Sequence, residues 1–274
     1  MRLSMLLYSE TFGVKTQASQ PTLVFLHGLL GNGRDWRYVI SQLATTYQCI
    51  TIDLPGHGLS AFVNTDMTTE AIDGGFEAVH QALTTTLLQR DVKDYVLVGY
   101  SMGARLAMYH ACALATHSIS SPDSPRLIKV LLEGGHFGLA VADREPRYLH
   151  DQRWAARFAQ QPLVDVLHDW YQQPVFASLT VEQRQALVVK RSDNLGSGIA
   201  QMMLATSLAK QPQLLPQLQQ LAIPIHYLCG ERDDKFCQLA STSGLEVTVI
   251  ENAGHNIHIE QPTTFTAALL NFID

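Results

Sequence analysis

The sequence predicts an α/β fold in which helices flank a mostly parallel sheet. Short apolar runs that are typical of buried strands alternate with longer segments of helical periodicity, through about the first half and the last quarter of the chain. The chain has 274 residues and 46% hydrophobic content, which is enough to bury one large core. We therefore expect one α/β domain, carrying a helical insertion.

The strongest local signal is Gly-Tyr-Ser-Met-Gly at residues 99–103, between an apolar strand-like run and a helical pattern over residues 104–115. A tight strand-to-helix turn that exposes a serine needs small neighbours, which Gly99 and Gly103 supply. Ser101 would then stand at a helix N-terminus, where unpaired backbone N–H groups favour developing negative charge. An ordinary Gly-Ser turn is the alternative, but the strand before it and the helix after it favour a nucleophile.

A serine nucleophile needs a histidine to take its proton and a carboxylate to orient that histidine. Asp233 directly follows a buried strand-like run and is the expected acid, with Asp234 and Glu231 as competitors. His255 lies in the loop after the next strand-like run and is the expected base. His258 competes less well because it lies further into the following segment. The order serine, acid, histidine is the one expected after such a turn.

The loop that follows the first buried apolar run is expected to supply an amide for an oxyanion hole. We assign the two donors to the backbone N–H groups of Leu29 and Met102, which would converge on oxygen charge formed in the transition state. His27 is expected to be a structural hydrogen-bonding residue. Asp53 and His57 lie in a tight loop set by glycine and proline, and they are given no chemical role.

Between residues 135 and 210 the alternation of strands and helices stops. The pattern there is helical, with expected interruptions at Pro146, Pro162 and Pro174. We interpret this segment as a helical cap, inserted between two parts of the core at residues 1–134 and 211–274.

The expected cap is rich in arginine, although the whole chain is acidic. Its arginines are Arg144, Arg147, Arg153, Arg157, Arg184 and Arg191. Arg153 and Arg157, four residues apart, are expected to lie solvated on a helix surface. Arg105 differs, because it lies one turn after Ser101 on the helix of the expected nucleophile. A guanidinium beside that serine favours an anionic substrate, since its fork binds carboxylates in a bidentate manner.

Composition excludes several other classes. The net charge of −6 argues against a general nucleic-acid binder. No stretch of 18 or more apolar residues suggests a membrane span, and residues 1–8 are interpreted as a first strand and not a signal peptide. The four cysteines show no CxxC spacing, so we expect free thiols in a reducing cytoplasm and no zinc site.

Together these motifs resemble the α/β-hydrolase superfamily. A more specific resemblance covers nearly the full chain, cap included. It is carried by Glu-Gly-Gly-His at 133–136, the aromatic-rich run 170–179, Lys-Arg-Ser at 190–192, Cys-Gly-Glu-Arg-Asp at 229–233 and Ala-Gly-His-Asn at 253–256. These groups are similar to the 2-succinyl-6-hydroxy-2,4-cyclohexadiene-1-carboxylate synthase family of menaquinone biosynthesis. The resemblance implies a lyase that needs no metal or organic cofactor.

The implied substrate is a small tricarboxylate, 2-succinyl-5-enolpyruvyl-6-hydroxy-3-cyclohexene-1-carboxylate, from which pyruvate is eliminated. Three carboxylates give the arginines a physical reason to be present. Carried over by matching motif, the triad is Ser101, Asp233 and His255, and the substrate-binding residues are Tyr100, Arg105, Arg147, Trp170 and Arg191. The spacing over residues 140–148 is shortened relative to the family, so Arg144 is an alternative to Arg147.

The expected chemistry follows from these residues. His255, held by Asp233, would deprotonate Ser101, and the alkoxide would remove a ring proton; direct removal by His255 is the other possibility. The Leu29 and Met102 amides would receive the charge that develops on the succinyl ketone oxygen. Two alternatives use the same residues differently. One is a serine hydrolase of small acidic esters or thioesters, and the other is a ligand-binding member of the fold without activity.

Overall fold

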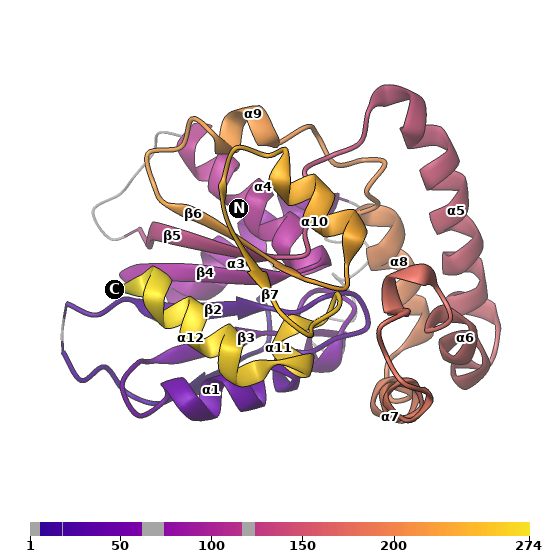
Figure 1. Ribbon diagram of the computed structural model, residues 1–274, viewed down its shortest axis with the longest axis horizontal. Coiled ribbons are helices and arrows are strands. Elements are labelled where there is room, and N and C mark those ends of the chain that lie inside the picture. The colour runs from indigo at the N-terminus through magenta and orange to yellow at the C-terminus, as the bar shows by residue number, and fades with distance from the viewer. Residues whose placement is uncertain (1–5, 18, 62–73, 117–123) are drawn as a thin grey trace.

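The computed structural model describes residues 6–17, 19–61, 74–116 and 124–274. These residues form a seven-stranded sheet in the order β1-β3-β2-β4-β5-β6-β7 (Figure 1). The strands are β1 (Ser9–Phe12), β2 (Thr22–Leu26), β3 (Cys49–Ile52), β4 (Asp94–Tyr100), β5 (Arg126–Glu133), β6 (Ile225–Gly230) and β7 (Glu246–Ile250). Only the β1–β3 pair is antiparallel. The predicted α/β fold with a mostly parallel sheet is confirmed.

Helices cover both faces of this sheet, as parallel strands require. One face packs against the helices α3 (Gly75–Gln89), α4 (Met102–Thr116), α9 (Leu215–Leu218) and α10 (Asp234–Ser241). The other face packs against α1 (Arg37–Leu43), α11 (Ile257–Glu260) and α12 (Pro262–Ile273). The central strands are apolar and buried, with all five residues of β2 and the last six of β4 removed from solvent. The carboxyl ends of these strands therefore meet at one fixed edge.

The expected first strand is displaced along the chain. Of its predicted span, residues 1–5 lie outside the described part, and residues 6–8 are not a strand; β1 begins at Ser9. The backbone amides just before β1 bind side chains instead of a neighbouring strand: Leu7 donates to Thr86 Oγ1 at 3.0 Å and Tyr8 to Ser60 Oγ at 2.8 Å. The apolar residues before β1 therefore pack into the core without forming a strand: Leu7 is buried in the core but does not belong to the sheet.

The segment between β5 and β6 is helical, and Figure 1 shows most of it beside the sheet on the right. It contains α5 (Val141–Gln160), α6 (Leu163–Trp170), the 3-10 turn η3 (Pro174–Phe176), α7 (Val181–Arg191) and α8 (Gly196–Ala205). Pro162 precedes α6 and Pro174 opens η3, as expected. The interruption expected at Pro146 is wrong, because this residue lies within α5. Early in a long helix, its missing N–H removes one hydrogen bond without ending the helix. The cap boundaries at 135 and 210 stay a prediction.

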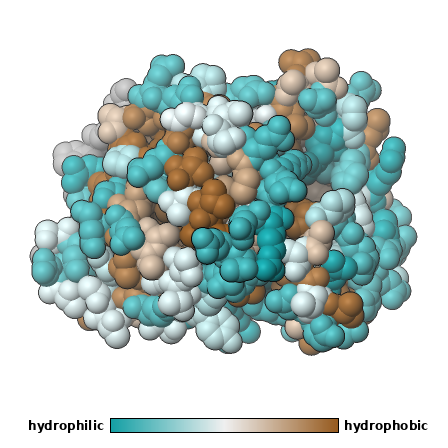
Figure 2. Space-filling view, viewed as in Figure 1, coloured by the Kyte–Doolittle hydropathy of each residue, from teal (hydrophilic) through white to brown (hydrophobic). Residues whose placement is uncertain are grey.

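All four cysteines are free thiols, as expected, and three of them are buried. Within the described ranges, no helix has the length and apolar character needed to cross a membrane. In Figure 2 the surface where α10 faces the helices α5 to α7 is mainly hydrophilic. This is the region of the carboxyl edge of the sheet, where the candidate site lies.

Candidate active site

Ser101 occupies a strained turn between β4 and α4. Its φ of 51° is in the left-handed region that a residue with a side chain rarely adopts. The turn is held because the Ser101 amide donates to the Glu133 carbonyl oxygen at 2.7 Å. A Cβ at Gly103 would lie 2.5 Å from the carbonyl oxygens of Leu26 and His27, so only glycine fits there. The turn thus projects the hydroxyl away from the sheet.

The structure brings the three predicted triad residues together. His255 Nε2 lies 3.2 Å from Ser101 Oγ, and His255 Nδ1 lies 2.7 Å from Asp233 Oδ2. His255 and Asp233 are both buried. Glu231, one competing acid, instead accepts the amide of Asn252 at 3.0 Å. Asp234 lines the same pocket, but the carboxylate bound to the imidazole is that of Asp233. A hydroxyl, an imidazole and a carboxylate in this arrangement can move a proton from Ser101 to His255.

His258, the competing base, belongs to a different pair. Its Nδ1 lies 2.8 Å from Glu133 Oε2, and both side chains are almost fully buried. The ring of Trp36 stacks on the His258 ring at 4.2 Å. His258 is therefore bound to Glu133 and does not line the pocket, whereas the imidazole at Ser101 Oγ is that of His255. This pairing was not predicted, because the two residues are 125 positions apart in sequence.

The two predicted oxyanion donors belong to residues that line the same pocket as Ser101. The Met102 amide is in the first turn of α4, where backbone N–H groups have no helical partner. Leu29 precedes Leu30, whose φ of 67° bends the loop. No described residue accepts a hydrogen bond from the Leu29 amide. Both residues thus line the pocket of Ser101 with backbone amides that have no protein acceptor among the described residues.

Three residues that were given no proton-transfer role fix this loop. His27 Nε2 accepts the Leu54 amide at 2.9 Å, and His57 Nε2 accepts the Leu30 amide at 3.1 Å. Burial lowers the pKa of His27 to about 4 and that of His57 to about 3, so both rings are neutral acceptors near pH 7. Asp53 accepts the Gly33 amide at 2.7 Å. These contacts agree with the structural role expected for His27.

The pocket around Ser101 has a volume of about 610 Å³. Its walls hold all five predicted substrate-binding residues, Tyr100, Arg105, Arg147, Trp170 and Arg191. The Tyr100 ring lies 5.3 Å from the His255 ring, and Trp170 packs edge-on against Trp154 at 5.0 Å. The described residues contain no group of three or more His, Cys, Asp or Glu side chains that could hold a metal ion.

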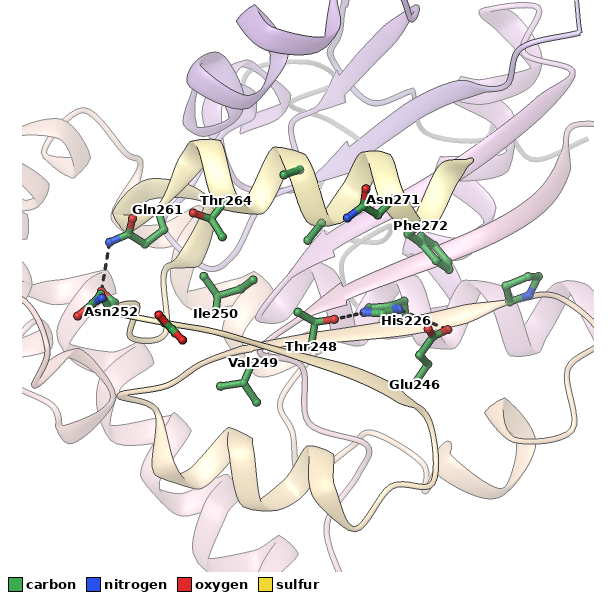
Figure 3. A pocket seen from close by; sticks show the side chains of 14 residues that line it. His226, Glu246, Thr248, Val249, Ile250, Asn252, Gln261, Thr264, Asn271 and Phe272 are labelled. Carbon is green, nitrogen blue, oxygen red and sulfur yellow. Dashed lines mark hydrogen bonds and ion pairs between the residues drawn. The ribbon is translucent and has the colours of Figure 1, made fainter.

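A second, larger groove of about 810 Å³ lies between β7 and α12, as Figure 3 shows. Polar side chains of this groove are bound within the protein: His226 Nε2 lies 2.8 Å from Thr248 Oγ1, and Gln261 Nε2 donates to the Asn252 backbone carbonyl at 3.4 Å. None of the triad residues lines it. The smaller pocket is therefore the candidate active site.

Two arginines of the pocket are held by groups at its wall. Arg105 Nη1 donates to the Thr206 carbonyl at 2.8 Å, and Arg147 Nε donates to Asp151 Oδ1 at 2.8 Å. Burial and the neighbouring Arg147 lower the pKa of Arg105 to about 9, so it remains a cation at neutral pH. Arg144 instead donates to the Leu139 carbonyl at 3.3 Å and does not line the pocket. The geometry favours Arg147 over Arg144 as the pocket residue.

Arg191 reaches the pocket from the end of α7 and is buried. Its Nη2 lies 2.8 Å from Asp35 Oδ2, while Lys190 Nζ lies 2.7 Å from Asp35 Oδ1. Although burial opposes the charge, Asp35 raises the pKa of Arg191 above its usual value. Arg191 Nε and Nη1 have no hydrogen-bond partner among the described residues. Asp35 was missed as a site residue; its only sequence signal is the capping box with Asn32.

The expectation of plain solvation is wrong for Arg157. Its Nη2 pairs with Asp169, and its guanidinium lies 4.9 Å from the centre of the Trp154 ring. The side chain is only partly exposed, because the carboxylate and the ring replace part of its water. Arg153 is exposed, as expected.

Comparison with known proteins shows the family of the chain. Residues 23–269 match the model of the alpha/beta hydrolase family. The 2-succinyl-6-hydroxy-2,4-cyclohexadiene-1-carboxylate synthase of Serratia proteamaculans (strain 568) is 46% identical over 94% of each chain. The chain belongs to this synthase family. The synthase of Yersinia pseudotuberculosis serotype O:3 is 45% identical over 94% of this chain and 89% of its own. MenH from S. aureus superposes with a TM-score of 0.83 at 27% identity, covering 97% of both chains.

Replacement of Gly134 by alanine is expected to lower kcat by roughly tenfold, since small misplacements of a catalytic group are costly. Gly134 has φ of 60°, and a Cβ there would lie 2.8 Å from His255 Cε1. The control is Gly244→Ala, because Gly244 has φ of 67° but meets only the Gln219 side chain, at 3.3 Å. Both variants should melt at lower temperature, and only Gly134→Ala should lose turnover. Equal activities would show that Gly134 does not set the position of His255.

Proposed function

We propose that this enzyme eliminates pyruvate from 2-succinyl-5-enolpyruvyl-6-hydroxy-3-cyclohexene-1-carboxylate in menaquinone biosynthesis. The observation that carries the proposal is a serine, histidine and aspartate chain in a pocket whose walls also carry Arg105, Arg147 and Arg191. Guanidinium groups suit a substrate with three carboxylates. The names of the relatives at 45–46% identity support the same reaction.

In the proposed mechanism His255 Nε2 accepts the Ser101 proton across the 3.2 Å contact. Asp233 holds Nδ1 protonated, which leaves Nε2 free as the base. The Ser101 alkoxide then removes a proton from the ring carbon of the substrate. A positioned general base of this kind contributes roughly 10²–10⁴-fold to the rate. Direct removal of the ring proton by His255 is the alternative route through the same residues.

Loss of the ring proton sends an electron pair into the conjugated system and toward the succinyl ketone oxygen. The Leu29 and Met102 amides are the proposed donors to that oxygen. As the electron pair returns from the ketone oxygen to the ring, the second ring double bond forms and the bond from the ring carbon to the enolpyruvyl oxygen breaks. The released enolate of pyruvate takes up a proton and becomes pyruvate. Water is not a reactant, and Ser101 forms no covalent bond to the substrate.

We also propose that the enzyme works in the cytoplasm on a small tricarboxylate and without a nucleic-acid partner. Its free thiols support a reducing compartment. The net charge of −6 argues against polyanions such as nucleic acids, while the arginines inside the pocket suit a small anion.

The test of the proposed function is the product. Purified enzyme should release one pyruvate for each diene formed from the enolpyruvyl cyclohexene substrate, followed with a coupled pyruvate assay and by ultraviolet absorbance. Mass spectrometry of the quenched reaction should find no adduct on Ser101. Nitrophenyl acetate should turn over poorly, because it offers no carboxylates to the arginines. Efficient ester hydrolysis without pyruvate release would favour the serine hydrolase alternative.

A further inference from the structure

His136 lines the pocket at the end of β5 but lies outside the proton-transfer chain. Its Nδ1 lies 3.1 Å from the Gly138 backbone nitrogen. A backbone amide can only donate, so Nδ1 must accept and carries no proton. The neutral ring therefore has its hydrogen on Nε2. No described residue binds this Nε2, which leaves one N–H donor in the wall of the pocket.

Positive charge surrounds this ring. Burial, and then the nearby Lys235, Arg105 and Arg147, lower the pKa of His136 to about 4. The imidazole is thus neutral near pH 7, and it presents a hydrogen-bond donor in the midst of three cations. A neutral donor can be directed at one oxygen atom without adding to the repulsion among the charges.

The cations around His136 are only partly compensated. Arg147 is paired with Asp151, whereas Arg105 binds the Thr206 carbonyl and no carboxylate. Lys235 has no carboxylate partner within the described ranges, and its ammonium lies 5.5 Å from the centre of the Phe236 ring. Excess positive charge in a partly desolvated wall calls for an anion.

The geometry of the wall is fixed through Gln211. Its Nε2 donates to the His136 carbonyl oxygen at 2.6 Å, and its Oε1 accepts from Arg105 Nη1 at 3.4 Å. Gln211 is fully buried. His136 and Arg105 are therefore held in one relative position before any ligand arrives, which lowers the cost of binding.

We propose that His136 donates its Nε2 hydrogen to a substrate carboxylate that is held by Arg105, Arg147 and Lys235. Lys235 and His136 are thereby assigned as further binding residues of the site. Asp151 is paired with Arg147, and Asp233, the carboxylate near Lys235, is bound to His255, so a substrate carboxylate would supply the counter-charge that Arg105 and Lys235 lack. The assignment rests on the proposed function, since it takes the carboxylate from that substrate.

Two variants separate the donor role from a structural role. In His136→Asn the short amide can still accept the Gly138 N–H in place of Nδ1, but it has no donor at the position of Nε2. In His136→Gln the longer amide places an N–H near the former Nε2 and gives up the Gly138 contact. We expect His136→Asn to raise KM for pyruvate release roughly 10- to 100-fold with kcat little changed. His136→Gln should restore KM to within a few-fold of the wild type.

A merely structural histidine gives the opposite order, with His136→Gln impaired and His136→Asn normal, and that result would overturn the proposal. Equal KM values in the two variants, whether both normal or both raised, would also overturn it. His168→Asn is the matched control, because His168 is exposed on α6 and does not line the pocket. Lys235→Gln should raise KM and make it less sensitive to salt, since an exposed cation acts through screened charge. An unchanged KM in this variant would remove Lys235 from the subsite.

A binding measurement that needs no turnover distinguishes failure of the proposed function from failure of the proposed carboxylate subsite. Succinate is titrated into the wild type and both His136 variants, with calorimetry as the readout. If the wild type releases no pyruvate but binds succinate more tightly than His136→Asn does, the reaction is wrong and the carboxylate subsite stands. If the wild type releases pyruvate and the His136 variants behave alike, the reaction stands and the subsite is wrong. If the wild type neither turns over nor binds succinate, both are wrong.

Discussion

Replacement of Ser101 by alanine is expected to lower kcat for pyruvate release by roughly 10²–10⁴-fold while the protein stays folded. The hydroxyl is the atom that His255 Nε2 contacts at 3.2 Å, so its removal deletes the proposed base for the ring proton. Asp233→Asn and His255→Ala should lose activity to a similar extent, because Asp233 holds the imidazole in the orientation that the serine needs. Pyruvate assays together with circular dichroism would check both halves of the expectation.

The three residues should also act as one unit. The triple variant should be about as inactive as Ser101→Ala alone, since each single change already breaks the chain. A triple variant impaired by the product of the three single effects would show that the residues act independently. Retention of high activity in Ser101→Ala, with loss only in His255→Ala, would instead assign direct proton removal to the histidine.

The sequence predicts the sheet and the triad well because the signals there are local. Short apolar runs are typical of buried strands, and each triad residue lies in the turn or loop that follows a strand-like run. Parallel strands end at the same edge, so residues that follow them come together whatever their separation in the chain. Ser101 and His255 are 154 positions apart, yet their strand positions predict their contact.

The parts that the sequence did not predict depend on tertiary contacts without a local pattern. Leu7 belongs to an apolar run that resembles a strand, but side chains of distant residues take up the amides there. Asp35 and Arg191 pair across 156 positions, between the 3-10 helix Gly33–Trp36 and the end of α7. The density of arginines in the cap indicated an anionic ligand. Which arginines line the pocket, and which pair elsewhere, is set by the packing of the helices.

The arginines of the pocket give the second large effect. Arg105→Ala is expected to lower kcat/KM by roughly 10- to 150-fold, because the loss of one partner from a charge-assisted hydrogen bond costs on the order of 1.5–3 kcal/mol. Arg105→Lys should recover only part of the loss, since an ammonium cannot present the guanidinium fork. The rates of pyruvate release over a range of substrate concentrations would measure both variants.

Arg191 needs a different comparison, because its guanidinium also binds the buried Asp35. Arg191→Ala leaves that carboxylate with Lys190 as its remaining cation, so the variant should lose stability as well as activity. Arg191→Lys keeps a positive charge beside Asp35 but lacks the free Nε and Nη1 donors. If Arg191 binds a substrate carboxylate, Arg191→Lys should melt near the wild-type temperature and still lose kcat/KM by roughly tenfold or more. Full activity in Arg191→Lys would leave positive charge alone as the role of Arg191, and full activity in Arg105→Ala would remove Arg105 from substrate binding.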